Sequence, residues 1–172
     1  MHLVRHALPH AAGGPQVTVT ADTVVIGIGN DHRRDDGIGP AVAAAVAARG
    51  LPGVRVHRCA AELTAILDAW AGADVAVIVD AVVGGTPGRV GRCSLDDVTE
   101  SATLSSHDLN LRQTYELGRA LGRAPASVVV VTIDIADTGY GSGLSPAVAT
   151  ALPHAVAEVI ALVEHAQKAA HQ

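Results

Sequence analysis

The fold of this chain is most constrained by short, continuous apolar runs that alternate with longer segments of helical spacing. Three runs, at residues 23–28, 75–79 and 128–133, consist almost entirely of β-branched and small apolar residues. Runs of this length without polar alternation are typical of strands that are buried on both faces of a parallel sheet. Parallel strands need crossover connections, and the intervening segments are long enough to supply helices for them.

Four segments have the periodicity of amphipathic helices. Apolar residues within 63–70 repeat at i, i+3, i+4 and i+7, which is the spacing of one buried helical stripe. Similar spacing predicts a helix over residues 38–49, and Ser105 or Ser106 can cap a third. These helices fall where crossovers between strands are required.

The final helix has clear start signals. Ser145 is a favoured N-cap residue, and Pro146 suits the first helical turn. Valines and leucines then recur on one face as far as residue 163. Pro153 should kink this helix or divide it in two, because proline has no backbone N–H and clashes with the preceding turn.

Two shorter strands, around residues 54–56 and at 90–94, complete the order strand, helix, strand, helix, strand, strand, helix, strand, helix. This order predicts an α/β fold: a three-layer sandwich whose mostly parallel, twisted five-stranded sheet carries helices on both faces. One domain is expected over residues 23–165, between a flexible N-terminal tail, 1–22, and a C-terminal tail, 166–172. Hydrophobic residues make up 49% of the chain but include no Phe, so small side chains must build the core.

Composition disfavours several classes of function. The 17 acidic residues outnumber the 12 Lys and Arg residues, the net charge is −5 and no long basic run is present, so nucleic acid is a poor candidate partner. Residues 1–16 lack an apolar segment of signal-peptide length, so neither export nor a membrane span is expected. Cys59 and Cys93 do not form a CxxC pair and are expected to stay reduced in the cytoplasm.

Three polar residues should meet at one edge of the predicted sheet. Asp36 lies at the junction of the first loop and first helix, Asp80 closes the third strand, and His107 opens the helix after the edge strand. In sheets of this kind, ligands bind outside the carboxyl ends of the strands. Two carboxylates and one imidazole can hold a divalent ion of borderline hardness and leave positions open for substrate or water. These three residues are therefore the predicted catalytic and metal-contacting residues.

Each of these residues also has a purely structural interpretation. Asp36 could be an N-cap, Asp80 could bond backbone amides at a strand end, and His107 could be an ordinary first-turn residue. For each residue taken singly, the structural role is the commoner one. The joint placement of all three on one edge, from separate crossovers, favours a functional site.

The first loop, residues 27–39, follows a strand and precedes a helix, as dinucleotide-binding loops do. Its glycines lack the spacing of that fingerprint, and the carboxylates of Asp35 and Asp36 at the helix start would repel phosphate. Acidic residues there suit a cation site or a cap. Arg33 and Arg34, in the same loop, could steer an acidic or C-terminal peptide segment.

Four sequence motifs occur in order along residues 23–163. They are Gly27–Asn30 with Asp35–Gly39, Val79–Ala81 with the Pro87–Gly88 turn, Ser105–His107, and Gly143–Pro146. In kind, order and spacing, these motifs resemble those of the [NiFe]-hydrogenase maturation endopeptidases. That family removes a C-terminal extension from the hydrogenase large subunit.

The resemblance implies a peptide-bond hydrolase with the α/β fold expected above. It implies that Asp36, Asp80 and His107 occupy the family's acid, acid and histidine positions, which contact nickel. It also implies that the partner is a large-subunit precursor, and that this precursor supplies the nickel. Asp36 stands where many members carry Glu, and residues 58–62 replace a Gly-rich segment, so the precursor could differ from those of other members.

Two other functions fit the same residues. A non-catalytic nickel-binding maturation chaperone would use the same triad but release its cargo uncut. A peptidyl-tRNA hydrolase relative would also begin with a strand and a similar glycine-asparagine turn, although the negative charge disfavours tRNA. The sequence leaves open which carboxylate acts as the base and which oligomeric state the protein adopts.

Overall fold

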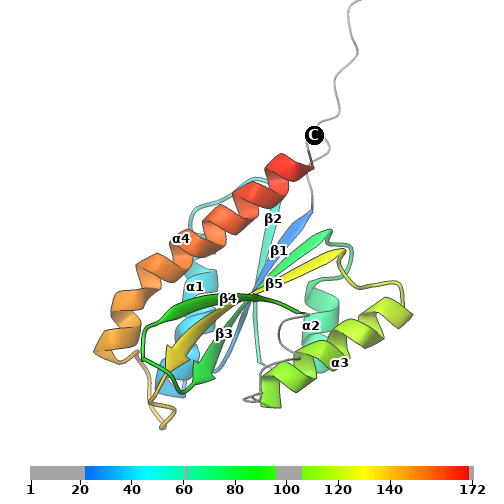
Figure 1. The fold of residues 1–172 in the computed structure, drawn as a ribbon. Helices are drawn as coiled ribbons and strands as arrows, with labels where there is room; N and C mark the ends of the chain where they lie inside the picture. The colour runs from blue at the N-terminus through cyan, green and yellow to red at the C-terminus, as the bar shows by residue number, and fades with distance from the viewer. Residues whose placement is uncertain (1–21, 61, 96–105, 171–172) are drawn as a thin grey trace, which may run out of the picture.

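The computed structural model describes residues 22–60, 62–95 and 106–170, and for residues 106–110 it describes the backbone alone. Within this part of the chain, the strands form one five-stranded sheet in the order β2-β1-β3-β5-β4 (Figure 1). Adjacent strands pair in parallel, except that β4 pairs antiparallel with β5. The strands are β1 (Thr23–Ile28), β2 (Val54–Cys59), β3 (Val75–Val83), β4 (Val90–Ser94) and β5 (Ser127–Ile135).

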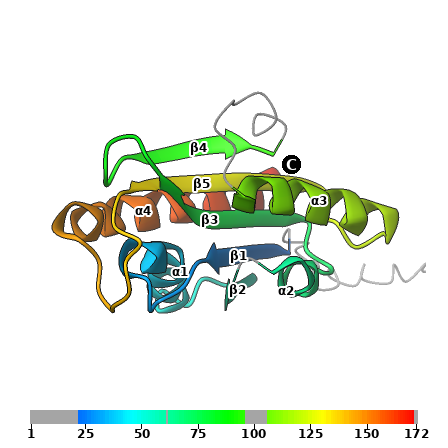
Figure 2. The same ribbon diagram turned by 90° about the horizontal axis from the view of Figure 1, so that it is seen from below.

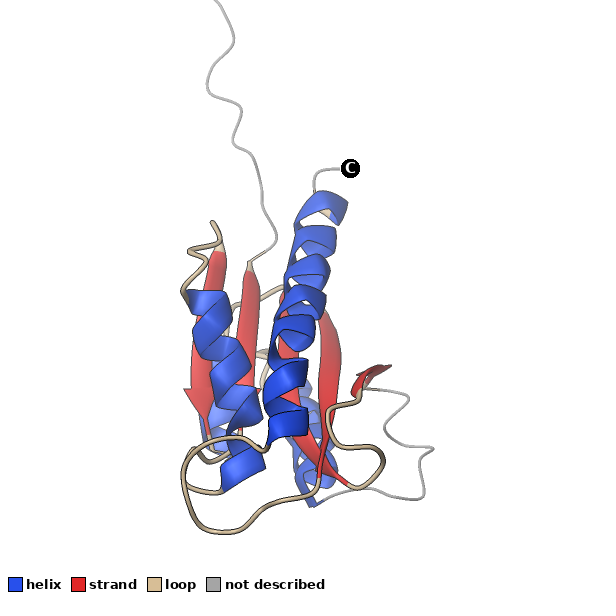
Figure 3. Cartoon of the chain, turned by 90° about the vertical axis from the view of Figure 1, so that its left-hand side faces the viewer, coloured by secondary structure: helices blue, strands red, loops and turns tan. Residues whose placement is uncertain are grey.

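Helices cover both faces of this sheet. Seen from below, the strands follow one another from β4 to β2 (Figure 2), and α1 and α4 lie side by side on one face (Figure 3). The other face is covered by α2 and α3. The predicted three-layer α/β sandwich with a mostly parallel five-stranded sheet is confirmed. The helices are α1 (Ile38–Ala47), α2 (Leu63–Ala69), α3 (Ser106–Ala120) and α4 (Pro146–Ala169), and a 3-10 helix, η1 (Arg34–Gly37), precedes α1.

Each face of the sheet contributes to its own hydrophobic core. Val25, Val77 and Val79 belong to the core under α1 and α4, whereas Ile26 and Ile78 belong to the core under α2 and α3. All five side chains are fully buried. Strands that are covered on both faces must be apolar at every position, which is why the central runs in the sequence lack polar alternation.

β3 and β5 are longer than their apolar runs predict and continue to Val83 and Ile135. β1 pairs with β3 only as far as Gly27 and Val79, whereas β3 and β5 remain paired up to Val83 and Ile135. Asp80 therefore lies within β3 rather than closing it as predicted. It is nevertheless the first β3 residue beyond the pairing with β1, so it occupies a step in the carboxyl edge of the sheet.

The final helix, α4, runs unbroken over 24 residues, so Pro153 does not divide it. Pro153 and Ala149, the residue whose carbonyl loses its helical N–H partner, are both exposed, so water can satisfy that carbonyl. Buried valines on both sides of the proline, Val148 and Val156, hold the two halves of the helix on one core.

The observed limits of the domain differ from the predicted ones at both ends. α4 continues past residue 165, the expected end of the domain, to Ala169. Of the expected N-terminal tail, residues 1–22, only Asp22 lies within the described residues, where its carboxylate pairs with the Arg55 guanidinium of β2 at 3.3 Å.

By length and composition alone, α4 could cross a membrane, with a mean hydropathy of 1.6. Its apolar side chains pack against α1 and the sheet in the same core. One face of α4 is buried, and this packing accounts for the valines of that face.

Candidate active site

Asp80 is buried at the step between β1 and β3, with 5% of its surface exposed. Its Oδ1 accepts a hydrogen bond from the backbone N–H of Ala81 at 2.9 Å, which fixes the orientation of the carboxylate. Ile28 of β1 pairs with Cys59 at the end of β2. Burial and the charges of Asp80 and Glu62 raise the pKa of the Cys59 thiol. The charge of Asp80 therefore acts across the end of β1 as far as β2.

Asp36 lies in η1 and is partly exposed. Its Oδ2 accepts a hydrogen bond from the Asn30 backbone N–H at 3.0 Å, and the Asn30 Oδ1 accepts one from the His32 N–H at 2.9 Å. The N-cap of α1 is Gly37, so Asp36 does not have the capping role that was its structural alternative. Its Oδ1 accepts no hydrogen bond within the described residues, which leaves this oxygen available to a ligand.

Glycines bring the start of α1 against the ends of two strands. A side chain on Gly39 would overlap the carbonyl oxygen of Ile28, and its Cβ would lie 2.8 Å from the carbonyl oxygen of Val79. The space needed by a side chain on Gly27 is likewise occupied by the Gly39 carbonyl. The glycines of the first loop thus permit backbone-to-backbone packing and do not form a phosphate cradle. This packing sets η1, which carries Asp36, beside the end of β3.

His107 is the second residue of α3, as the sequence predicts for a residue that opens this helix. α3 begins at the lower end of Figure 1, the end that the arrowheads of β3 and β5 reach. The side chain of His107 lies outside the described residues. Among the side chains that are described, no group of three His, Cys, Asp or Glu residues could hold a metal. The structure therefore brings Asp36 and Asp80 to one corner, and the three-residue metal contact stays a prediction.

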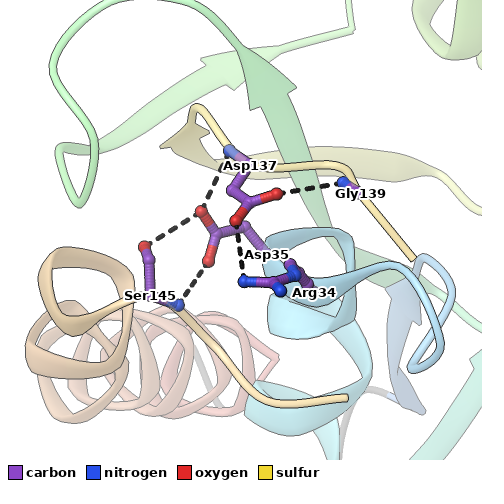
Figure 4. Close-up of polar contacts among 5 residues, drawn as sticks. All are labelled: Arg34, Asp35, Asp137, Gly139 and Ser145. Carbon is purple, nitrogen blue, oxygen red and sulfur yellow. Dashed lines mark hydrogen bonds and ion pairs between the residues drawn. The ribbon is translucent and has the colours of Figure 1, made fainter. Parts of the chain in front are cut away.

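Asp35, the neighbour of Asp36, has a role that the sequence did not reveal. It is completely buried, and its Oδ1 accepts a hydrogen bond from the Ser145 backbone N–H at 2.6 Å. Its Oδ2 accepts bonds from the Ser145 hydroxyl at 3.0 Å and from the Asp137 N–H at 3.3 Å (Figure 4). Ser145 is the N-cap of α4, as predicted. Its hydroxyl donates a hydrogen bond to Asp35 and makes no capping bond to the helix. Asp35 thus ties η1 to the start of α4.

Two loops beside Asp35 are joined into one structure, here called the lip, which comprises residues 32–34 and 137–141. Arg33 and Gly141 form an isolated parallel bridge, and the Arg34 N–H donates to the Gly141 carbonyl at 3.0 Å. The Arg33 guanidinium donates to the Thr138 carbonyl from two nitrogens, at 3.3 and 3.2 Å. Arg34 pairs with Asp137 at 3.1 Å (Figure 4).

Among the described side chains of this corner, the two carboxylates are the groups suited to chemistry. Asp80 is buried and oriented, whereas Asp36 is partly exposed and has an oxygen available, so the two acids are placed in different environments. Cys59 is a poor nucleophile here because a raised pKa keeps its thiol protonated at neutral pH. Carboxylates of this kind can bind a cation or transfer protons to and from a substrate.

Comparisons with known proteins agree with this fold. The model of the HycI hydrogenase maturation protease family matches residues 60–162. The hydrogenase maturating endopeptidase HybD from E. coli has a TM-score of 0.71 at 22% identity, covering 83% of this chain and 92% of that chain. HybD from Thermococcus kodakarensis has a TM-score of 0.69 at 21% identity, covering 82% and 98%.

HycI from Thermococcus kodakarensis KOD1, another [NiFe] hydrogenase maturation protease, has a TM-score of 0.64 at 26% identity, covering 84% of this chain and 92% of that chain. No curated protein sequence matches the chain significantly.

Proposed function

This chain belongs to the hydrogenase maturation protease family, and from that premise we propose that it removes the C-terminal extension of a [NiFe]-hydrogenase large-subunit precursor. Membership of the family makes it a hydrolase of peptide bonds. The observation that carries the finer proposal is the corner where buried Asp80 and partly exposed Asp36 lie at the carboxyl edge of the sheet. We expect the reaction to occur in the cytoplasm.

The nickel of the precursor belongs to the substrate in this proposal, and Asp36, Asp80 and His107 contact it. Two carboxylates and an imidazole form a donor set that suits a divalent ion of borderline hardness. The available Oδ1 of Asp36 and the oriented carboxylate of Asp80 support this assignment. A bound nickel ion would supply Lewis acidity to the scissile carbonyl or to the attacking water.

The two acids then have separate tasks. Asp80 is held by the Ala81 N–H and serves to orient the substrate's metal. Asp36 is partly exposed, and with Oδ1 on the nickel its Oδ2, which keeps a second lone pair beside the Asn30 N–H, can accept a proton from water and return it to the leaving amine. The bond from Asn30 keeps Asp36 in place during this transfer, since catalysis depends on correct positioning of the reacting groups.

The proposal predicts that the purified chain shortens a nickel-loaded precursor and that Asp80→Asn or His107→Ala slows this cleavage by about a hundredfold or more. Asp68→Asn is a suitable control, because Asp68 is an exposed acid of α2 whose ion pair with Arg123 lies far from the chemistry in the fold. The rate is measured as loss of full-length precursor on a gel. Unchanged cleavage by Asp80→Asn contradicts the site, and a wild-type chain that binds the precursor without shortening it favours the chaperone.

A further inference from the structure

Tyr140 is the most unusual side chain on the surface of the lip. The chain contains no Phe, one Trp and two Tyr. Trp70 is fully buried, and Tyr115 packs edge to face against it with ring centroids 6.3 Å apart. Tyr140 is 93% exposed. A side chain that buries so little surface contributes almost nothing to folding through the hydrophobic effect, so its position calls for another explanation.

Hydrogen bonds fix the backbone on both sides of Tyr140. Gly141, which follows it, donates its N–H to the His32 carbonyl at 2.9 Å and accepts the bond from Arg34 described above. Gly139, which precedes it, donates to the Asp137 carboxylate at 3.0 Å (Figure 4). Arg34 adopts a left-handed backbone with φ of 47°, a conformation that persists only where surrounding contacts enforce it. An aromatic ring on such a support loses little conformational entropy when it binds a partner.

Two arginines flank Tyr140 on the lip. Arg33 and Arg34 are exposed on the same lip and hold the loop on either side of the tyrosine. Arg34 is paired with Asp137, whereas Arg33 binds only a carbonyl and has no carboxylate partner within the described residues. Tyrosine and arginine are the residue types, with tryptophan, that are most enriched among the energetically dominant positions of protein interfaces.

The lip is continuous with the candidate active site. Arg34 and Asp36 belong to the same 3-10 helix, and the Asp36 N–H donates to the Arg33 carbonyl at 3.1 Å. A protein chain bound at Asp36 can therefore also contact the lip. We propose that Tyr140, flanked by Arg33 and Arg34, is the anchor residue that binds the hydrogenase large-subunit precursor for cleavage. This inference rests on the proposed function.

Tyr140→Ala tests this inference in the full-length protein. We expect both the Kd for nickel-loaded precursor and the KM for its cleavage to rise by about tenfold or more, with kcat changed by less than about twofold. Tyr140→Phe should retain most of the affinity because the ring remains. The control is Leu121→Ala, which removes another exposed apolar side chain, 55% exposed and directly after α3. Fluorescence of the buried Trp70 verifies that each variant is folded.

The outcomes separate this inference from the proposed function. If the wild-type chain cleaves the precursor and Tyr140→Ala does so with unchanged KM and Kd, the lip is not the anchor although the function stands. If the wild-type chain binds the precursor without cleaving it and Tyr140→Ala loses binding, the anchor stands and the protease proposal is wrong. A wild-type chain that neither binds nor cleaves the precursor overturns both. A change in self-association alone, seen by sedimentation, also overturns the anchor.

Discussion

Asp35 and Asp36 are adjacent in the chain but lie in opposite environments. Asp35 is completely buried and accepts three hydrogen bonds, whereas Asp36 is partly exposed and accepts one. In the sequence, both are acids at a helix start, and only Asp36 was singled out, as the acid at the junction of the first loop and the first helix. Which of two neighbouring acids is buried depends on the partners that reach it, and Ser145 and Asp137 are more than a hundred residues away. Local spacing carries no signal for such contacts.

Replacement of Asp35 by Asn should destabilise the protein. The new amide group would face N–H donors with its own NH₂, so at least one buried bond is lost and the remaining ones no longer have a charged acceptor. We expect the free energy of unfolding to fall by about 2–4 kcal/mol. Asp31→Asn, at an exposed acid of the same loop, should change it by less than about 0.5 kcal/mol. Urea titration followed by Trp70 fluorescence measures both free energies, and equal effects would contradict the role of Asp35 in tying η1 to the start of α4.

Cys59 reports on the charge of Asp80. Because its folded-state pKa is raised, the folded protein binds the thiol proton more tightly than the unfolded chain does. The resulting stability is present below the ordinary thiol pKa and is lost as the pH rises through the folded value. At pH 8 we expect Cys59 to be alkylated more slowly in the folded protein than in urea, with modification at Cys59 followed by peptide mass mapping.

The matched variant for this measurement is Asp80→Asn. Removing the negative charge should lower the pKa of Cys59 and move its alkylation profile to lower pH, although burial and Glu62 keep part of the shift. An alkylation profile that is identical in Asp80→Asn and the wild type would mean that the two groups do not interact across the sheet edge.

At the scale of elements, the site depends on how closely α1 approaches β1 and β3. The contact is made through Gly27 and Gly39, whose missing side chains leave room for the carbonyls of the opposing backbone. The overhang of β3 beyond β1 adds the step on which Asp80 lies. An apolar run predicts that a strand exists, but the end of the strand depends on its neighbours. The sequence therefore located β3 correctly and ended it too early.

Gly39→Ala should disturb this contact. Its Cβ would overlap the Ile28 carbonyl, so α1 and η1 must move away from the sheet, and Asp36 must move with them. We expect a loss of about 2 kcal/mol or more in stability and a fall of about a hundredfold in cleavage rate. Gly50→Ala, near the end of α1, meets no atom within 4 Å and should cost only about 1 kcal/mol for its left-handed backbone, with cleavage retained. Equal cleavage by the two variants would contradict the role of the Gly39 contact.

At the scale of the whole molecule, the strand and helix order follows from periodicity because each central strand is covered on both faces. The two cores explain the continuous apolar runs, and packing on α1 and the sheet explains the apolar length of α4. Pro153 does not divide α4, because burial of the valines on both sides of this exposed proline outweighs one lost hydrogen bond. The corner formed by Asp36 and Asp80 was predicted from topology, since loops at the carboxyl ends of parallel strands converge. The lip was not predicted as a structure, because its bonds join segments that are far apart in the chain.

In the proposed function, Asp36, Asp80 and His107 act together on a nickel-loaded precursor. The most direct measurement is the intact mass of that precursor after incubation with the wild-type chain, beside the same precursor without nickel and beside His107→Ala. We expect the loss of a C-terminal peptide only when nickel is present and the protein is wild type. Equal shortening of the nickel-free precursor, or equal shortening by His107→Ala, would contradict it.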